Sequence, residues 1–257
     1  MSASTKPTPL TATLAKGLEV LEALADVDEI GLSQLARQLG LSGPTLYRIL
    51  ATLAARGYVE KSAASRYRLT AKAWEIGARA MRRMGLRDLA RPAMERLART
   101  TRETVHLSVR LGEDIVIIEK VDGLEPVRVD TYVGLRAPIH CSATGKALVA
   151  WEPPAALDAL LPRRLLRYSD QTITDHGAFA RELAAVRRMG WAKNREEWRP
   201  GVCAAAAPVR DTSGAVVAAL SVTVPTSRFS AEAVRRLVPA LTEASDAISR
   251  LVTRKAG

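Results

Sequence analysis

The fold of the N-terminal part is decided by residues 31–61, which read GLSQLARQLGLSGPTLYRILATLAARGYVEK. Apolar residues recur at helical spacing in two runs of this stretch, one before and one after Gly40. Glycine is favoured at the left-handed position that ends a helix. Ser33 and Ser42 stand ahead of the two runs as N-cap residues. The stretch therefore predicts two short helices joined by a tight turn.

Further elements extend this helix pair on both sides. A leucine-rich pattern predicts a helix before it, over 14–25. After it, residues 58–61 and 66–69 are typical of two strands joined by a small polar turn. Three helices followed by a hairpin is the element order of a winged helix-turn-helix. We expect this domain over 10–70, after a flexible tail over 1–9.

The second helix of the pair has the features of a DNA-reading helix. The short turn before it holds it at a steep angle, which leaves its N-terminal turn free to enter a major groove. Hydroxyl and guanidinium groups can bond phosphates or base edges, from this helix and from the hairpin. The residues expected to contact DNA are Ser33, Gln34, Ser42, Gly43, Thr45, Tyr47, Arg48, Thr52, Arg66, Tyr67 and Arg68. Two have a structural alternative: Tyr67 as a packed strand residue, and Arg48 as part of a solvated helix face.

Composition and charge fit a nucleic-acid partner. The 257 residues carry a formal net charge of +11, a balance that favours anionic partners. Residues 1–100 hold 16 Lys and Arg against 9 Asp and Glu, whereas residues 101–257 hold 22 against 18. Two cysteines are too few for a disulfide framework and fit a reducing cytosol. A polar N-terminus without a signal peptide, and no apolar run of membrane-spanning length, predict a cytoplasmic protein with no membrane partner.

The remaining chain is expected to form a linker and a second domain. A helical stretch over 71–102 serves as the linker, divided by Gly85 and Pro92. Beyond it the apolar period changes to two. Strands are expected over 105–110, 115–118, 127–133, 204–209 and 216–224, and helices over 142–151, from 174 or 175 to 188, and over 231–253. Strands and helices mixed with tight hairpins predict an α+β domain of the sensor type over 103–257.

Two segments of this second domain are candidates for the wall of a ligand cavity. Residues 140–147 place a turn before a helix N-terminus, where backbone N–H groups favour an anionic ligand such as a carboxylate. Ser142 and Thr144 add hydroxyl donors, although a capped helix packed closely through a glycine is the structural alternative. Ser221 and Thr223 share one face of a strand, where they line a cavity or hydrogen-bond within a core.

Motifs along nearly the whole chain resemble those of the IclR family of transcriptional regulators. The resemblance starts in GLSQLARQLGLSGPTLYRILATLAARGYVEK and YRLT, and continues through ETVHLSVRLGEDIVIIEKVDG, APIHCSATGKALVA, TITDHGAFARELAAVRRMGWAKNREEWRPGV and AAPVRDTSGAVVAALSVTVP. It implies a winged-helix domain, a linker helix and a GAF-like effector-binding domain. It also implies homodimers, or homotetramers that are dimers of dimers, on palindromic operators in double-stranded DNA. The implied effector is a small metabolite, often an organic or aromatic acid, and the implied role is to repress or activate neighbouring genes.

The resemblance also implies where the effector binds, because the family's pocket uses the positions of Asn194 and Ala204. Together with the candidate segments, the set is Val129, Ala143, Thr144, Gly145, Asn194, Cys203, Ala204, Ser221 and Thr223. Many relatives carry Asp and Cys where this chain has Asn194 and Ala204, and Cys203 lies one place earlier. Replacing a carboxylate by an amide changes the charge and the hydrogen-bonding inventory of the site, so the effector of a relative is not transferable.

The segment just before the last hairpin offers further side chains. Trp191 and Trp198 could pack over an aromatic effector, or serve the core or an interface. Glu196 and Glu197 are adjacent carboxylates in a loop, and at least one of them is expected in a solvated turn.

Three alternatives stay open beside the regulator. A cysteine-dependent enzyme would pair Cys141 with His140, although adjacent residues on a strand point to opposite faces. A zinc site could use Cys and His residues scattered through the second domain. An architectural DNA-binding protein would leave that long domain without a purpose. We expect a non-enzymatic regulator with no catalytic residue, no metal and no cofactor.

Overall fold

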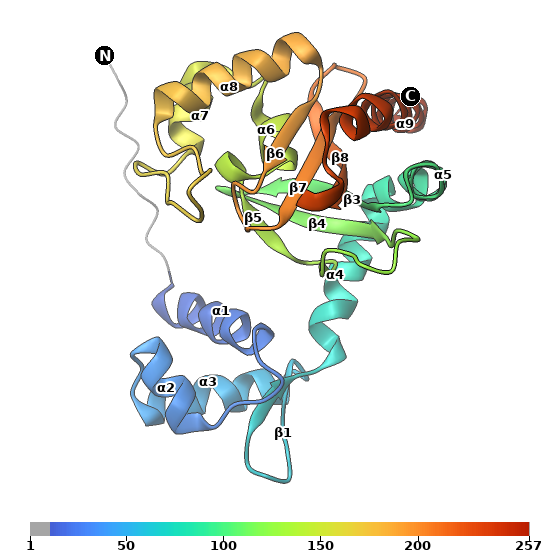
Figure 1. The fold of residues 1–257 in the computed structure, drawn as a ribbon. Helices are drawn as coiled ribbons and strands as arrows, with labels where there is room; N and C mark the ends of the chain where they lie inside the picture. Colours follow the sequence, from blue (N-terminus) through green and yellow to red (C-terminus); the bar gives the residue numbers. More distant parts are fainter. Residues whose placement is uncertain (1–10, 257) are drawn as a thin grey trace, which may run out of the picture. The chain divides into compact units, whose positions relative to one another are not determined.

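The computed structural model describes the backbone of residues 11–256, and the side chains in that range except those of 78–84 and 255–256. The chain forms two compact units, residues 1–83 and 84–257 (Figure 1). The tail expected over 1–9 lies outside the described residues. None of the described helices combines the length and the apolar character needed to cross a membrane.

The first unit is built on three helices and a hairpin, as the sequence predicts. Its elements are α1 (Ala12–Ala25), α2 (Leu32–Leu39), α3 (Gly43–Ala55), β1 (Val59–Lys61), β2 (Tyr67–Leu69) and α4 (Ala71–Met84). One core joins α1, α2, α3 and the hairpin, and its largest members are Val20, Leu24, Ile30, Leu35, Leu46, Ile49, Leu50, Val59 and Tyr67. These residues recur every three or four positions along the helices, so burying them determines how the helices pack.

The turn between α2 and α3 confirms one predicted cap and corrects another. Gly40 has a φ of +63°, and the N–H groups at the end of α2 bond carbonyls of the preceding turn, which is how a glycine ends a helix. Ser42 occupies the N-cap of α3 as expected. The prediction that Ser33 caps α2 is wrong, because α2 already begins at Leu32 with Gly31 at its N-cap. The helix starts early because Ile30, directly before the cap, is held in a β-bridge to the hairpin.

The hairpin places Tyr67 inside the unit rather than on its surface. Strand β1 pairs with β2 in antiparallel register, with Glu60 opposite Arg68. Tyr67 also pairs with Ile30, and its side chain is only 6% exposed. The expectation that the Tyr67 side chain contacts DNA is therefore wrong. The packed-strand alternative describes it, because Tyr67 belongs to the buried core that the three helices share with the hairpin.

The second unit is a six-stranded antiparallel sheet with helices on both faces (Figure 1). Its helices are α5 (Leu86–Thr101), α6 (Ala143–Val149), α7 (Pro154–Leu160), α8 (His176–Met189) and α9 (Ala231–Ala256). Its strands are β3 (Thr104–Leu111), β4 (Asp114–Val121), β5 (Arg136–Pro138), β6 (Ala192–Arg195), β7 (Val202–Arg210) and β8 (Val216–Pro225), in the order β5-β4-β3-β8-β7-β6. The α+β architecture is confirmed.

Strand alternation divides the sheet into two unlike faces. Helices α5 and α9 pack on one face, where β3 contributes Val105 and Leu107. Helix α6, backed by α8, packs on the other, where β3 contributes His106 and Ser108. The face under α6 therefore carries the polar residues of β3, and any cavity between sheet and helix is lined by them.

Two predicted features of the second unit are wrong. Residues 127–133 form no strand: they run as an irregular loop between β4 and β5, with Val127 69% and Tyr132 62% exposed. Alternating apolar residues do not make a strand without a neighbour to hydrogen-bond. Pro92 does not divide the linker stretch either, since it lies inside α5, whereas Gly85 separates α4 from α5 as expected. Burial of Met94 and its neighbours outweighs the one backbone hydrogen bond that proline removes.

Candidate functional sites

The exposed face of α3 carries the side chains that the sequence predicts for DNA contact. Ser42, Arg48 and Thr52 are exposed, and Tyr47 is 58% exposed. The Ser42 hydroxyl donates to Thr45 Oγ1 at 2.8 Å, which orders the first turn of the helix. Arg48 has no ion-pair partner among the described residues, so its guanidinium is available to an outside acceptor. The geometry suits insertion of the N-terminal turn of α3 into a groove.

The two arginines of the hairpin are held by carboxylates that sequence reasoning missed. Arg66 bonds the side chain of Glu29 at 3.1 Å and its main-chain oxygen at 2.9 Å. Arg68 Nε lies 2.6 Å from Glu60 Oε1, its cross-strand partner. The pairs are partly or largely exposed, and such pairs contribute only about 0–1 kcal/mol. Both arginines can therefore exchange their carboxylate partners for phosphate oxygens. The pair between Arg68 and Glu60 follows only from the register of the hairpin.

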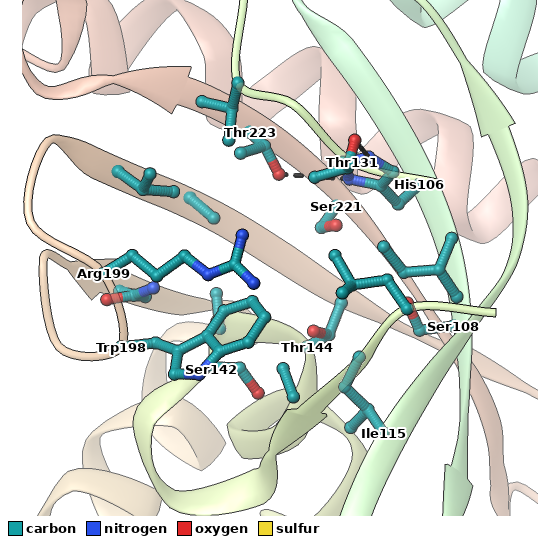
Figure 2. Close-up of a pocket in the computed structure, with 18 residues that line it drawn as sticks. His106, Ser108, Ile115, Thr131, Ser142, Thr144, Trp198, Arg199, Ser221 and Thr223 are labelled. Carbon is teal, nitrogen blue, oxygen red and sulfur yellow. Dashed lines mark hydrogen bonds between the residues drawn. The ribbon is translucent and has the colours of Figure 1, made fainter. Parts of the chain in front are cut away.

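The second unit contains a cavity between the sheet and α6, with a volume of about 60 Å³ (Figure 2). Its lining residues come from β3, β4, β5, β6, β7, β8, the start of α6 and the two loops that follow β4 and β6. They are His106, Ser108, Ile115, Ile117, Val129, Thr131, Leu135, Ala137, Ser142, Ala143, Thr144, Asn194, Trp198, Arg199, Val202, Ala204, Ser221 and Thr223. Seven of the nine residues predicted for effector binding are in this lining.

Gly145 and Cys203 are the two predicted residues outside the lining. A Cβ on Gly145 would stand 2.3 Å from the main-chain oxygen of Ile139, so the glycine serves close packing of α6 on the preceding turn. Cys203 is buried, and its Sγ lies 3.3 Å from Thr226 Oγ1. Because residues alternate along β7, Cys203 faces away from the side on which Ala204 meets the cavity.

His106 is a cavity residue that sequence reasoning did not assign to the effector site. Its Nδ1 lies 3.1 Å from Thr223 Oγ1 and its Nε2 lies 2.8 Å from Thr131 Oγ1. Burial, reinforced by the charge of Lys120, lowers the pKa of His106 to about 4. The ring is therefore neutral near pH 7 and both nitrogens have threonine partners. The sequence does contain a signal for this role, because strand alternation places His106 on the polar face of β3.

The polar groups on the sheet side of the cavity differ in whether they have partners. Asn194 Oδ1 accepts from the Glu197 N–H at 2.8 Å, so the amide NH₂ is the part of Asn194 left for a ligand. Ser108 is 0% exposed, and its hydroxyl has no hydrogen-bond partner among the described residues. A buried polar group without a partner is uncommon and requires an explanation.

A buried lysine anchors the loop beside the cavity. Lys146 is 0% exposed, and its Nζ bonds Glu197 Oε1 at 2.7 Å, Glu182 Oε1 at 3.0 Å and the main-chain oxygen of Lys193 at 3.0 Å. Burial raises the pKa of the Glu197 carboxyl, against the lowering effect of Lys146. Glu197 is thus a buried structural carboxylate, whereas Glu196 is half-buried and accepts from the Gly201 N–H at 2.7 Å.

Trp198 and Arg199 follow this anchor and lie at the cavity. The guanidinium carbon of Arg199 is 4.1 Å from the centre of the Trp198 ring, a cation–π contact. Figure 2 shows both side chains on the side of the cavity formed by the loop, across from Ser108 and Ile115. The sequence offers Trp198 as a cover for an aromatic effector, with a core or interface role as the alternative. Arg199 is not predictable as a cavity residue from the sequence, because nothing in its local sequence shows where the loop folds back.

The geometry around Cys141 does not assemble a nucleophile and its base. His140 and Cys141 lie in a short 3₁₀ turn rather than on a strand (Ile139–Cys141). The His140 ring bonds the Leu166 main-chain oxygen at 2.9 Å. Burial raises the pKa of the Cys141 thiol to about 12, and a thiol with such a pKa is a poor nucleophile. Among the residues that the structure describes, no three His, Cys, Asp or Glu side chains gather as metal ligands.

Comparison with known proteins identifies the family. The model of the IclR helix-turn-helix domain matches residues 13–63, and that of the bacterial transcriptional regulator IclR C-terminal domain matches residues 78–250. The chain belongs to the IclR family. The HTH-type transcriptional regulator KdgR of Escherichia coli is 35% identical over 240 residues, which cover 93% of this chain and 91% of KdgR.

Crystal structures of IclR proteins confirm the fold. The IclR transcriptional regulator of Alicyclobacillus acidocaldarius superposes with a TM-score of 0.83 at 28% identity, covering 94% of this chain and 99% of that one. An IclR homologue of Microbacterium hydrocarbonoxydans, crystallised with 4-hydroxybenzoate, gives a TM-score of 0.81 at 28% identity and covers 95% and 100%. This IclR protein is accordingly a DNA-binding transcriptional regulator with an effector-binding C-terminal domain.

Proposed function

We propose that this regulator binds a palindromic operator in double-stranded DNA as a homodimer or homotetramer, and that a small organic acid in the cavity changes its operator affinity. The observation that carries the proposal is the convergence of seven predicted effector residues on one cavity under α6. These residues are separated by up to 94 positions in the sequence, from Val129 to Thr223, so a local fold requirement does not explain their meeting. A DNA partner would place the protein in the cytoplasm.

The DNA-contacting surface proposed here consists of α3 and its flanks. It retains Ser33, Gln34, Ser42, Gly43, Thr45, Tyr47, Arg48, Thr52, Arg66 and Arg68. Support comes from the exposed first turn of α3 and from the unpaired Arg48 guanidinium. The wing arginines would exchange Glu29 and Glu60 for phosphate oxygens on binding. The functional division would be a DNA-binding part over 10–70, a linker over 71–102 and an effector-binding part over 103–257.

The effector proposed is an acid small enough for a mostly apolar cavity with a few polar groups. The lining offers hydroxyls from Thr144 and Ser221 beside aliphatic residues, a mixture typical of sites for small organic ligands. The Ser142 hydroxyl also lines the cavity, but it caps α6, donating to the Pro138 main-chain oxygen at 2.9 Å and accepting from the Gly145 N–H at 3.0 Å. The homologue complexed with 4-hydroxybenzoate supports a carboxylic acid as the class of effector. No catalytic residue, metal or cofactor enters the proposal, since Cys141 and His140 are both engaged with main-chain oxygens.

The experiment is an operator-binding titration with the full-length chain. Fluorescence anisotropy on DNA from either side of the gene gives the operator affinity, first alone and then with each acid that raises the melting temperature in a thermal-shift screen. We expect at least one such acid to change the operator affinity. Ser221→Val and Thr144→Val are expected to lose that response and keep operator binding, whereas Thr242→Val on α9, outside the cavity, keeps both.

Two results would contradict the proposal. Specific operator binding that no stabilising acid alters would favour the constitutive architectural protein. Full effector response in both cavity variants would place the effector elsewhere.

A further inference from the structure

The cavity has an unbalanced charge. Among its eighteen lining residues no aspartate or glutamate occurs, and Arg199 is the one lining side chain that is cationic near pH 7. Asn194 also lines the cavity, and its amide oxygen already accepts from the Glu197 N–H. The remaining NH₂ group of Asn194 is a donor. Both features favour a ligand that carries negative charge and accepts hydrogen bonds.

Arg199 is an exposed residue at the rim of the cavity, and its guanidinium has a defined contact there. Its guanidinium stacks on Trp198 at 4.1 Å, and it has no ion-pair partner among the described residues. The residue two places earlier, Glu197, is tied to the buried Lys146 and to the Asn194 side chain. A guanidinium stacked on an aromatic ring loses less rotational freedom on binding a carboxylate than an arginine without such a contact does.

Ser108 supplies a second, independent observation at the same cavity. It lies on β3, on the face that also carries His106, opposite a register shift that leaves Ile118 of β4 without a partner on β3. The hydroxyl is buried, lines the cavity and has no partner in the described part of the chain. In Figure 2 it lies across the cavity from Arg199.

We propose that Arg199 is the counter-ion of the effector's carboxylate and that Ser108 pairs with a second polar atom of the same molecule. The effector class is then a hydroxy- or oxo-carboxylic acid, whose carboxylate lies at the loop side and whose hydroxyl or carbonyl oxygen lies at β3. This inference rests on the proposed effector function and assigns its specificity to two residues. Neither belongs to the set that sequence reasoning predicts.

The carboxylate arm of the test compares acids with their amides. The probes are 4-hydroxybenzoate with 4-hydroxybenzamide, and lactate with lactamide, titrated by calorimetry into the full-length chain. We expect at least one acid to bind about tenfold more tightly than its amide, a difference of about 1.4 kcal/mol. Arg199→Gln is expected to abolish this preference by weakening the acid alone. The matched control is Arg195→Gln, which removes the same charge from β6 outside the cavity lining.

The Ser108 arm compares hydroxylated with plain acids and adds a stability readout. Ser108→Ala is expected to weaken 4-hydroxybenzoate or lactate several-fold while leaving benzoate or propionate unchanged. The melting temperature of the free variant should be equal or higher, because the substitution removes a buried polar group that has no partner. Ser245→Ala is the contrast: this buried hydroxyl donates to Pro208 O at 2.6 Å on the other face of the sheet. It should lower the melting temperature and leave acid binding intact.

Three outcomes would overturn the inference. They are an acid preference that survives in Arg199→Gln, a loss of stability in free Ser108→Ala, and a wild-type chain that binds none of the acids better than the amides. Operator binding by the wild-type chain is measured in parallel. Intact operator binding that responds to other ligands would leave the proposed regulatory function standing while the specificity inference falls.

Discussion

Arg48 lies on the exposed face of α3 with no carboxylate partner among the described residues, in contrast to Arg66 and Arg68. Arg48→Ala should therefore weaken operator binding by about 1–3 kcal/mol, the range for one bidentate base contact. The helix itself should remain folded, since alanine is the strongest helix former. Anisotropy with operator DNA measures the effect. Arg250→Ala on α9 is the control, because it removes the same charge from the second unit. An equal loss of operator affinity in both variants would mean that Arg48 acts through the net charge and not through a base contact.

His106 gives the second unit a pH dependence whose sign follows from its lowered pKa. Its pKa is about 4 in the folded chain against 6.5 for the free side chain, mainly because of burial. Between these values the unfolded chain binds the extra proton, so stability falls as the pH drops from 6.5 towards 4. The loss is on the order of 3 kcal/mol.

Melting curves between pH 4.5 and 7.5 check this expectation. Burial also lowers the pKa of His140, so this second histidine contributes with the same sign. His106→Gln isolates the part due to His106, because the variant should melt with a shallower pH dependence than the wild type. Parallel curves for the two proteins would show that His106 is not the titrating group.

At the scale of elements, Lys146 connects α6 to α8 and to β6 and the loop beyond it, through Glu182, Glu197 and the Lys193 main chain. Lys146→Met should destabilise the second unit by roughly 3–5 kcal/mol, because it leaves the Glu197 carboxylate buried without its cation. Lys146→Met combined with Glu197→Gln should lose less than the sum of the single changes. Urea denaturation of the four proteins measures the coupling. Additive losses would mean that the ion pair does not connect the elements.

Strand alternation illustrates what local pattern predicts at this scale. It identified β3 and β8 and placed Ser221 and Thr223 on one face, because both strands have hydrogen-bonded neighbours. The same alternation over 127–133 led to a strand that does not form. There the chain is a loop, and Val129 lines the cavity from it. A period-two pattern therefore predicts which residues share a face only after pairing partners exist.

At the scale of the whole molecule, net charge decides how DNA binding responds to salt. The chain carries a net charge of +11. We expect the logarithm of the operator affinity to fall linearly with the logarithm of the salt concentration, because each neutralised phosphate releases counterions. The slope, at about 0.9 per phosphate contact, counts the contacts. Titrations between low and moderate salt give the slope, and a flat plot would rule out a binding mode based on phosphate contacts.

The sequence by itself determined the winged helix-turn-helix, the α+β class of the second unit and seven of the eighteen residues that line the cavity. The reason is physical: helical and strand periods report which face of an element is buried, and Gly40 reports a left-handed turn wherever it occurs. It did not reveal the burial of Tyr67, the loop over 127–133, or the roles of His106, Ser108 and Arg199. Each of these depends on what a distant segment brings alongside: Ile30 beside Tyr67, Lys146 beneath the loop that carries Arg199. Only the tertiary structure decides such pairings. Whether a residue is buried, and which residue it contacts, depends on a second segment that lies far away in the sequence.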